Sequence, residues 1–340
     1  MKKFLQNSKR WLPGAIISVL LVAAIAYFVD FQTMWESIKG ANYGILAGSA
    51  VLSFVWMMGR AKVWQTLLRD KPKYADALFA ASEGYLLNNF LPFRLGELGR
   101  AFLLSRKSGM AFSEILPTIV IERVVDLVIS AALLLVGLTY VTDAQGSARI
   151  GYIVGGAMMA GLAMMYLLAR NRQWALDTFH KLSGRWAFLQ KFGGSFLESF
   201  LTGLAVLTDG WLFLRFLFWM ILDWFVALVA YYLITLAFFP QAQFNWLYFV
   251  LGAAAFGGAI PALPGGVGTF EGAVSAALFL FTKDQSTSLA VALTARLYNY
   301  LNSGVLGGIG LMREGQTLSG VYRQLMNLRN KESEQENPRI

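Results

Sequence analysis

Long windows that are nearly free of charged residues constrain this sequence more than any other feature. A helix needs about 20 apolar residues to cross the hydrocarbon core of a bilayer. Five windows of 17 or more residues meet that condition, and a sixth, residues 115–141, is long enough despite its charges. The sequence therefore predicts an all-α polytopic membrane protein with about six full transmembrane helices. The other five windows are residues 11–29, 43–59, 150–169, 216–239 and 289–312.

The composition agrees with a membrane chain and removes several chemistries. Of 340 residues, 56% are apolar and 14% are charged, whereas soluble chains carry about 25% charged residues. Cysteine is absent and histidine occurs once, at His180. Disulfides, thiolate nucleophiles, Cys/His zinc sites and an HExxH pair are therefore excluded. We expect no catalytic residue, no metal site and no cofactor, in a protein that is not an enzyme.

Lysine and arginine residues predict the orientation. With the N-terminus in the cytoplasm and alternating spans, 22 basic residues fall on the cytoplasmic side, including five from Arg60 to Lys73. Only Lys39, Arg149 and Lys283 fall outside. This positive-inside bias places both termini in the cytoplasm. The net charge of +9 then reflects contact with the anionic inner leaflet of a bacterial or archaeal cytoplasmic membrane, and not nucleic-acid binding.

Two further apolar segments are interrupted by Pro and Gly and do not fit simple spans. The first, residues 74–104, has basic residues at both ends and contains LPFRLGELGRAFLL. The second, residues 246–281, is flanked by outer loops and contains PALPGGVGTFEG. Pro removes a backbone donor and Gly tolerates sharp reversals, so each segment is predicted to form two half-helices. We expect two re-entrant hairpins that enter from opposite faces of the membrane.

The two hairpins share a spacing that extends into the helix after each of them, and each is preceded by one span. Because the first unit begins outside and the second inside, we interpret them as inverted-topology repeats, which are common among secondary transporters. Two unrelated Gly/Pro loops are the alternative. The predicted organisation is an N-terminal transmembrane helix and outer loop (1–41), the first repeat (42–141), a connecting helix with cytoplasmic interfacial helices (142–210), the second repeat (211–312) and a basic cytoplasmic tail (313–340). The shared spacing relates Pro92, Gly96, Glu97 and Arg123-x-x-Asp126 to Pro264, Gly268, Glu271 and Arg296-x-x-Asn299.

A helix break inside the bilayer is expected only where a polar group binds, because unsatisfied backbone groups cost several kcal/mol in hydrocarbon. A half-helix that begins near Gly96 or Thr269 points its positive N-terminus toward the membrane middle, where an anionic group is favoured. Thr269 is a candidate N-cap with Glu271 in the first turn. Acids that merely cap their own helices are the alternative. GGVGTF lacks the GK[ST] of a phosphate-binding P-loop, so nucleotide binding is not predicted.

Charged residues within the predicted spans point to the same region. An Arg or Asp at the centre of a span costs about 2.5–3.5 kcal/mol on insertion scales, so these residues need partners or a function. An ion pair that locks helices together is the alternative, and for Asp126 the two interpretations are equally weighted. We expect Glu122 and Asp223 to be candidates for proton coupling. The predicted substrate-binding residues are Arg94, Glu97, Arg123, Asp126, Gly268, Glu271, Arg296 and Asn299.

These motifs resemble a known family. LPFRLGELGRAFLL, then ERVVD, then PALPGGVGTFEG and a closing helix that carries Arg296 are similar to the lysylphosphatidylglycerol synthase transmembrane-region family, also called flippase-like integral membrane proteins. The resemblance covers nearly the whole chain and implies a region that moves a lipid between leaflets. Only 28 residues follow Met312, and they form a polar tail with no aminoacyl-tRNA-binding domain, so we expect no lysyl-lipid synthesis. The resemblance leaves the substrate open.

Two weaker patterns complete the sequence. Residues 172–207 contain an apolar stripe with basic residues elsewhere, which predicts a helix in the cytoplasmic interface or a linker docked on the bundle. Gly304 and Gly308 have GxxxG spacing, which predicts close helix packing within the bundle.

The predicted function is translocation of a phosphate-bearing amphipathic lipid, such as a phospholipid, an aminoacylated phospholipid or a polyprenyl phosphate, through a polar cavity near mid-membrane. The alternatives are a small-solute or ion carrier, which the same repeats would suit, and a membrane-embedded lipid-modifying enzyme, which the scarcity of His disfavours. The predicted partners are membrane lipids with anionic head groups and no nucleic acid. A homo-oligomer and a partner lipid-modifying enzyme are left open.

Overall fold

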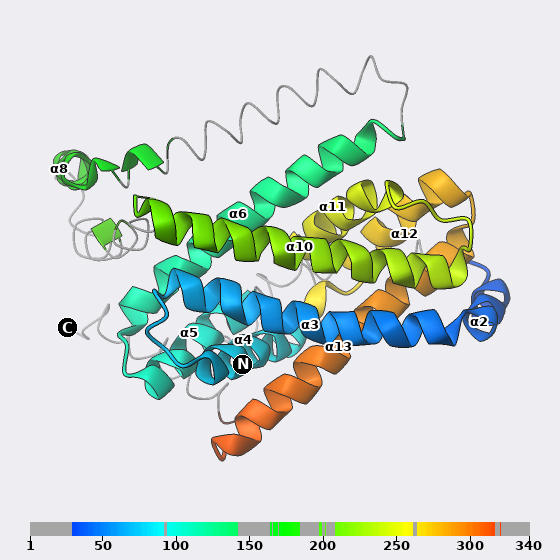
Figure 1. Cartoon of the computed structure of the whole chain (residues 1–340), viewed down its shortest axis with the longest axis horizontal. Helices are drawn as coiled ribbons and strands as arrows, with labels where there is room; N and C mark the ends of the chain where they lie inside the picture. Colours follow the sequence, from blue (N-terminus) through cyan, green and yellow to red (C-terminus); the bar gives the residue numbers. More distant parts are fainter. Residues whose placement is uncertain are drawn as a thin grey trace, which may run out of the picture.

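The computed structural model describes residues 29–91, 94–141, 208–260 and 264–316, together with residues 164, 166–168, 170–183, 197–198, 201 and 320. Within these residues the chain forms ten α-helices and one short 3-10 helix, and no strand (Figure 1). The expected all-α class is therefore confirmed. The elements are α2 (Phe31–Gly40), α3 (Tyr43–Leu67), α4 (Tyr74–Phe90), α5 (Leu95–Ser108), α6 (Phe112–Leu138), α8 (Arg172–Ser183), α10 (Gly210–Phe238), α11 (Trp246–Ala259), η3 (Pro264–Gly266), α12 (Thr269–Thr282) and α13 (Gln285–Arg313).

The long helices begin where short polar side chains satisfy their free amides. Asn42 Oδ1 accepts a hydrogen bond from the amide of Ile45 at the start of α3, and Asp209 Oδ1 accepts one from Leu212 at the start of α10. Asp284 caps α13 in the same way. These N-caps satisfy donors that otherwise have no partner inside the helix.

Among the described residues, α3 and α10 are the two helices that are long and apolar enough to cross a membrane. They run side by side along the molecule (Figure 1). Helices α6 and α13 are also long, with 27 and 29 residues, or about 40 Å each at 1.5 Å per residue. Both are long enough to cross a membrane, but α6 carries more charged residues than α3 and α10, and α13 carries more polar ones. The predicted spans 11–29 and 150–169 fall almost entirely outside the described residues.

The two interrupted segments each form a pair of short helices. In each pair, the first helix packs on its partner and on a long helix that is distant in sequence. Helix α4 packs on α5 and on α13, while α11 packs on α12 and on α6. The contacts of α4 with α13 therefore have a counterpart in the contacts of α11 with α6. Each short pair is held between helices that are distant in sequence.

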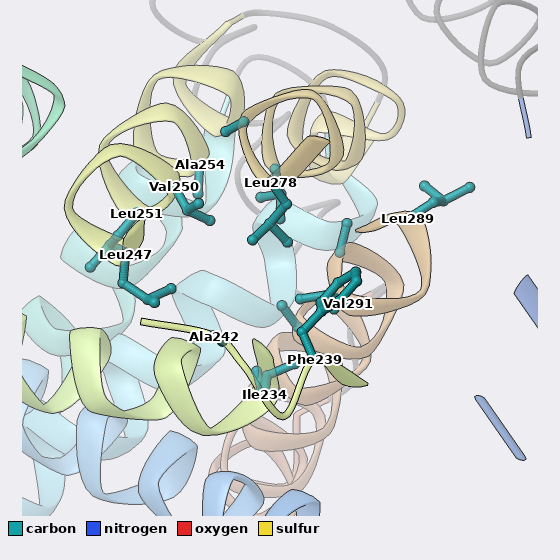
Figure 2. Close-up of a cluster of buried hydrophobic side chains, with 14 of the residues drawn as sticks. Ile234, Phe239, Ala242, Leu247, Val250, Leu251, Ala254, Leu278, Leu289 and Val291 are labelled. Carbon is teal, nitrogen blue, oxygen red and sulfur yellow. The ribbon is translucent and has the colours of Figure 1, made fainter. Parts of the chain in front are cut away.

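The largest apolar core lies where α10, α11, α12 and α13 meet. Figure 2 shows Leu247, Val250, Leu251 and Ala254 of α11 in this cluster together with Leu278 of α12. Leu247, Val250 and Leu278 are fully buried, and each such side chain contributes about 1.5–3 kcal/mol when it is removed from water. This core fixes the second helix pair against the closing helix.

The predicted interfacial segment forms α8 in part, and the rest of residues 184–207 lies largely outside the described residues. Ala175 of α8 is buried in a cluster with Leu212 and Phe216 of α10, whereas Trp174 is 62% exposed. The described helix therefore docks on the bundle by one face and leaves an aromatic side chain on the other.

The turn that joins α3 to α4 is built from charged residues in left-handed backbone conformation, with φ of 57° at Arg69 and 54° at Asp70. Asp70 accepts hydrogen bonds from Lys62 Nζ at 3.1 Å and from Arg215 Nη2 at 2.6 Å. Burial raises the pKa of the Asp70 carboxyl, but these two hydrogen bonds outweigh it and leave that pKa below its usual value. The turn thus ties α3 to the start of α10.

Candidate functional site

The first helix break lies between α4 and α5 and depends on a close backbone approach. Helix α5 begins at Leu95 after Arg94, whose φ is 53°. Asn88 Oδ1 accepts a hydrogen bond from the amide of Gly96 at 2.8 Å, so a side chain satisfies one of the freed donors. A Cβ at Gly84 would lie 2.9 Å from the carbonyl oxygen of Gly96. The small residues therefore let α4 touch the new helix start.

The second break is made by a glycine-rich turn. Gly265, Gly266 and Gly268 all have positive φ, which a residue with a Cβ adopts only with strain. The expected N-cap was Thr269, but the N-cap is Gly268, and Thr269 is the first residue of α12. Glu271 Oε2 accepts a hydrogen bond from the amide of Gly268 at 2.8 Å. The Glu271 carboxylate thus does the capping that was predicted for the hydroxyl of Thr269.

Arg296 of α13 binds the second break with its whole guanidinium. Its Nε lies 2.7 Å and its Nη2 3.1 Å from the Glu271 carboxylate. Nη2 also donates to the carbonyl of Gly266 at 2.9 Å, Nη1 donates to the carbonyl of Gly265, and the group lies over the Phe270 ring. A bidentate, charge-assisted pair of this kind is strong and directional. Arg296 was predicted to bind an anion at this break. In the structure its guanidinium stabilises the glycine-rich turn itself.

A buried ion-pair network joins α3, α5, α6 and α10. Its centre is Arg60 of α3, which is 3% exposed and pairs with three carboxylates. Arg60 Nε lies 3.0 Å from Glu122, Nη1 lies 3.3 Å from Asp223, and Nη2 contacts Asp126. Arg100 of α5 lies 2.9 Å from Glu97 and 3.3 Å from Glu122.

Arg60 was not among the predicted site residues, because it was counted as a cytoplasmic charge. Helix α3 continues to Leu67, so Arg60 lies inside it and not beyond its end. A periodic signal was present. Ser49, Ser53, Trp56 and Arg60 recur at steps of four, three and four residues, which places them on one helix face, and all four line the same cavity.

Arg123 and Arg296 occupy corresponding places in α6 and α13, the helices that follow the two broken segments. Arg123 lies 3.6 Å from Glu97, the acid that follows the first break, just as Arg296 pairs with Glu271 after the second. Arg123 also pairs with Glu122 at 2.6 Å and with Asp126 at 3.3 Å. Each closing helix is therefore linked by an Arg to the half-helix that precedes it.

Two adjoining chambers lie between the group of helices α3 to α6 and the group α10 to α13. The apolar chamber has a volume of about 460 Å³, and its walls include Trp56, Leu127, Trp224, Leu251 and Tyr298. The polar chamber has a volume of about 370 Å³, and its walls include side chains of Asn and Ser. The residues that line both chambers are Tyr85, Arg94, Arg123, Gly258, Ala259, Asn299 and Asn302.

Most of the predicted binding residues reach these chambers, and four of the predicted positions do not. Glu97 and Arg296 line the polar chamber, and Asp126 lines the apolar one. Gly268, Glu271 and Glu122 line neither, and Asp223 lines a separate pocket between α3 and α10. Asn302, which sequence reasoning missed, lines both chambers and leaves its buried Oδ1 without a hydrogen-bond partner among the described residues.

Arg94, at the junction of the chambers, differs from the other guanidiniums of the site in having no carboxylate partner among the described residues. Its Nη2 donates to the carbonyl of Gly258 at 2.5 Å, and no described carboxylate lies within ion-pair distance of it. Arg60, Arg100, Arg123 and Arg296 each have at least one such carboxylate. An anion that enters the polar chamber would therefore meet Arg94 without displacing an internal acid.

Comparisons with known proteins agree with these features. The family model described as the lysylphosphatidylglycerol synthase TM region matches residues 11–307. A UPF0104 membrane protein from Methanothermobacter thermautotrophicus is 21% identical over 308 residues, which cover 86% of this chain and 90% of that protein. No solved structure matches the chain. The long apolar helices, the two breaks and the match over most of the sequence lead to one conclusion: this membrane protein belongs to the lysylphosphatidylglycerol synthase transmembrane-region family.

Proposed function

We propose that the protein is a lipid transporter that moves a phosphate-bearing amphipathic lipid between the leaflets of the cytoplasmic membrane, without a chemical step. The observation that carries this proposal is the pair of adjoining chambers, one apolar and one polar, that share Arg94 and Arg123. A lipid has the same division, because its acyl or prenyl chains need an apolar wall and its head group needs hydrogen-bond donors. A small polar solute would leave the apolar chamber without a role.

Arg94 is the proposed anchor for the phosphate. Its guanidinium faces the junction of the chambers and has no internal carboxylate partner among the described residues, and a guanidinium binds phosphate oxygens in bidentate geometry. The side chains of Asn88, Asn89 and Asn299 line the same polar chamber. They supply neutral amides that suit the hydroxyl, ester or amine groups of a head group.

The proposal includes an inverted-repeat architecture, with one repeat built on α3 to α6 and the other on α10 to α13. Three correspondences support it: the α4–α13 contact matches the α11–α6 contact, each break is followed by an acid, and each acid pairs with an Arg of its closing helix. Both breaks border the polar chamber, since Arg94 follows the first and Gly265 and Gly266 form the second. Two such repeats around one site are suited to alternating access.

A reconstitution experiment tests the proposal. Purified protein in liposomes that contain a fluorescent phospholipid should make inner-leaflet probe accessible to an impermeant quencher added outside. Arg94→Gln should reduce the rate at least tenfold and leave the thermal stability in detergent close to that of the wild type. The matched control is Arg106→Gln, because Arg106 is an exposed residue on the same helix that lines neither chamber.

Two outcomes would contradict the proposal. The first is a wild-type protein that moves neither phospholipid nor polyprenyl phosphate but takes up a small solute, which would favour the carrier alternative. The second is an Arg94→Gln variant that transports lipid at the wild-type rate, which would remove the proposed phosphate anchor.

A further inference from the structure

The ion-pair network has an imbalance of charge in its buried part. Within ion-pair distance, three guanidiniums, those of Arg60, Arg100 and Arg123, contact four carboxylates. An uncompensated charge in a low-dielectric interior is costly, and a carboxylic acid that keeps its proton removes that cost. The direct ion pairs of the network are therefore balanced when one of its four acids is neutral. These acids are Glu97, Glu122, Asp126 and Asp223.

Asp223 contacts fewer guanidiniums than any of the other three acids. Glu122 contacts three guanidiniums, and Glu97 and Asp126 contact two each. Asp223 contacts only Arg60, at 3.3 Å, and shares it with two other acids. Its side chain is 1% exposed, and no described residue donates a hydrogen bond to its buried Oδ1.

Asp223 also borders a cavity that is distinct from the two chambers. This side pocket has a volume of about 470 Å³ and lies between α3 and α10, with Gly59 and Lys62 on one wall and Trp219 and Asp223 on the other. Oδ1 lies against Gly59, where a Cβ would come within 2.8 Å of it. The pocket extends to Lys62, whose ammonium pairs with Asp70 in the charged turn after α3. The side chains of Lys62 and Asp70 are 27% and 32% exposed, so the pocket borders a partly exposed turn that lines neither substrate chamber.

We propose that Asp223 is a proton-binding site that exchanges its proton through the side pocket and couples protonation to the substrate chambers through Arg60. The charged and titratable groups that face it are Arg60 and Lys62 of α3, Tyr74 of α4, and Glu122 and Asp126 of α6. The same guanidinium that contacts Asp223 also contacts Asp126, which lines the apolar chamber. Loss of the proton places a full charge beside Nη1 and draws Arg60 away from Asp126.

The protonation of Asp223 is measured without any transport assay. Infrared difference spectra of the purified protein near neutral pH should show the carbonyl stretch of a buried carboxylic acid, with a shift in D2O. Asp223→Asn should abolish the band. Asp177→Asn, the same change at an exposed position on α8, should leave it in place. A wild-type protein without the band, or a band that persists in Asp223→Asn, would overturn the assignment.

The route through the side pocket has its own test, which also serves if Asp223→Asn does not fold. Val226→Trp fills the pocket and should slow the exchange of the band from H2O to D2O at least tenfold. An unchanged exchange rate would show that the proton takes another path.

The coupling rests on the proposed lipid transport and is separated from it by a pH gradient across liposomes. The gradient should change the rate of lipid movement several-fold for the wild type and have no effect on Asp223→Asn. A wild-type rate that ignores the gradient overturns the coupling and leaves lipid transport intact. A wild type that shows the infrared band but moves no lipid overturns the proposed transport and leaves the proton site intact.

Discussion

Replacing Arg60 by Met removes the centre of the buried network and should cost far more stability than the loss of a surface ion pair. The methionine fills similar space without charge, so Glu97, Glu122 and Asp126 then have only the guanidiniums of Arg100 and Arg123 within ion-pair distance. One buried negative charge is left uncompensated even when Asp223 is neutral. Breaking a buried pair in this way costs about 3–5 kcal/mol, which lowers the ratio of folded to unfolded protein by a factor of about 160 to 5,000.

Unfolding by a denaturing detergent in mixed micelles, followed by tryptophan fluorescence, measures this difference. The matched control is Arg215→Met on α10. Its guanidinium lies 2.6 Å from Asp70, but both side chains are about one-third exposed, and a surface pair of this kind contributes about 0–1 kcal/mol. Asp126→Asn in the Arg60→Met background should recover part of the loss because it removes the uncompensated charge. Equal stability of Arg60→Met and Arg215→Met, or a further loss in the double variant, would refute the reasoning.

Four further outcomes are expected. Gly307→Ala should destabilise the protein by about 1–3 kcal/mol, because its Cβ would lie 2.8 Å from the carbonyl of Ser82, whereas Gly308→Ala should be tolerated because nothing lies within 4 Å; equal melting temperatures would contradict this. Arg296→Gln should lower thermal stability, unlike Arg94→Gln, because it unties the second break. The pKa of Asp70 is lowered in the folded protein, so the stability that it contributes should be present above its unfolded pKa, about 3.9, and be lost as the pH falls through the folded pKa. Unfolding of the wild type and of Asp70→Asn measured across this pH range checks the expectation, and an identical dependence of stability on pH in the two proteins would oppose it. Cysteine at position 243 should react with an impermeant thiol reagent from outside and cysteine at 73 should not; the reverse pattern would invert the topology.

The periodic and apolar features of the sequence predicted the helices well. The windows 43–59, 115–141, 216–239 and 289–312 correspond to α3, α6, α10 and α13, and the two breaks precede Leu95 and Thr269. Helices extend beyond the apolar windows because polar residues at their ends find partners in the bundle. Arg60 is the clearest case, since a count of basic residues treats it as a solvated charge although it is buried.

Side-chain pairing was harder to predict than backbone structure. That Arg123 and Arg296 bind an anion stays a prediction, but spacing did not show that each pairs with the acid that follows the preceding break. Which donor faces which acceptor depends on rotamers and on helix rotation, and neither is encoded in spacing. The GxxxG spacing pointed to the wrong glycines: a Cβ added at Gly304 or Gly308 would meet nothing within 4 Å, whereas one at Gly307 would lie against α4.

The packing of α4 against α13 has a consequence for how the chain is made. Asn89 and Ser303 form a 3.0 Å hydrogen bond across 214 residues of sequence. At about 5–20 residues per second, a ribosome needs on the order of 10–40 s to deliver the second residue after the first. During that time α4 lacks the helix that covers its polar face, including the carboxylate of Glu83, which is fully buried in the finished protein. Biosynthesis therefore has to shelter α4, by lipid head groups or by the insertion machinery, until α13 has been made.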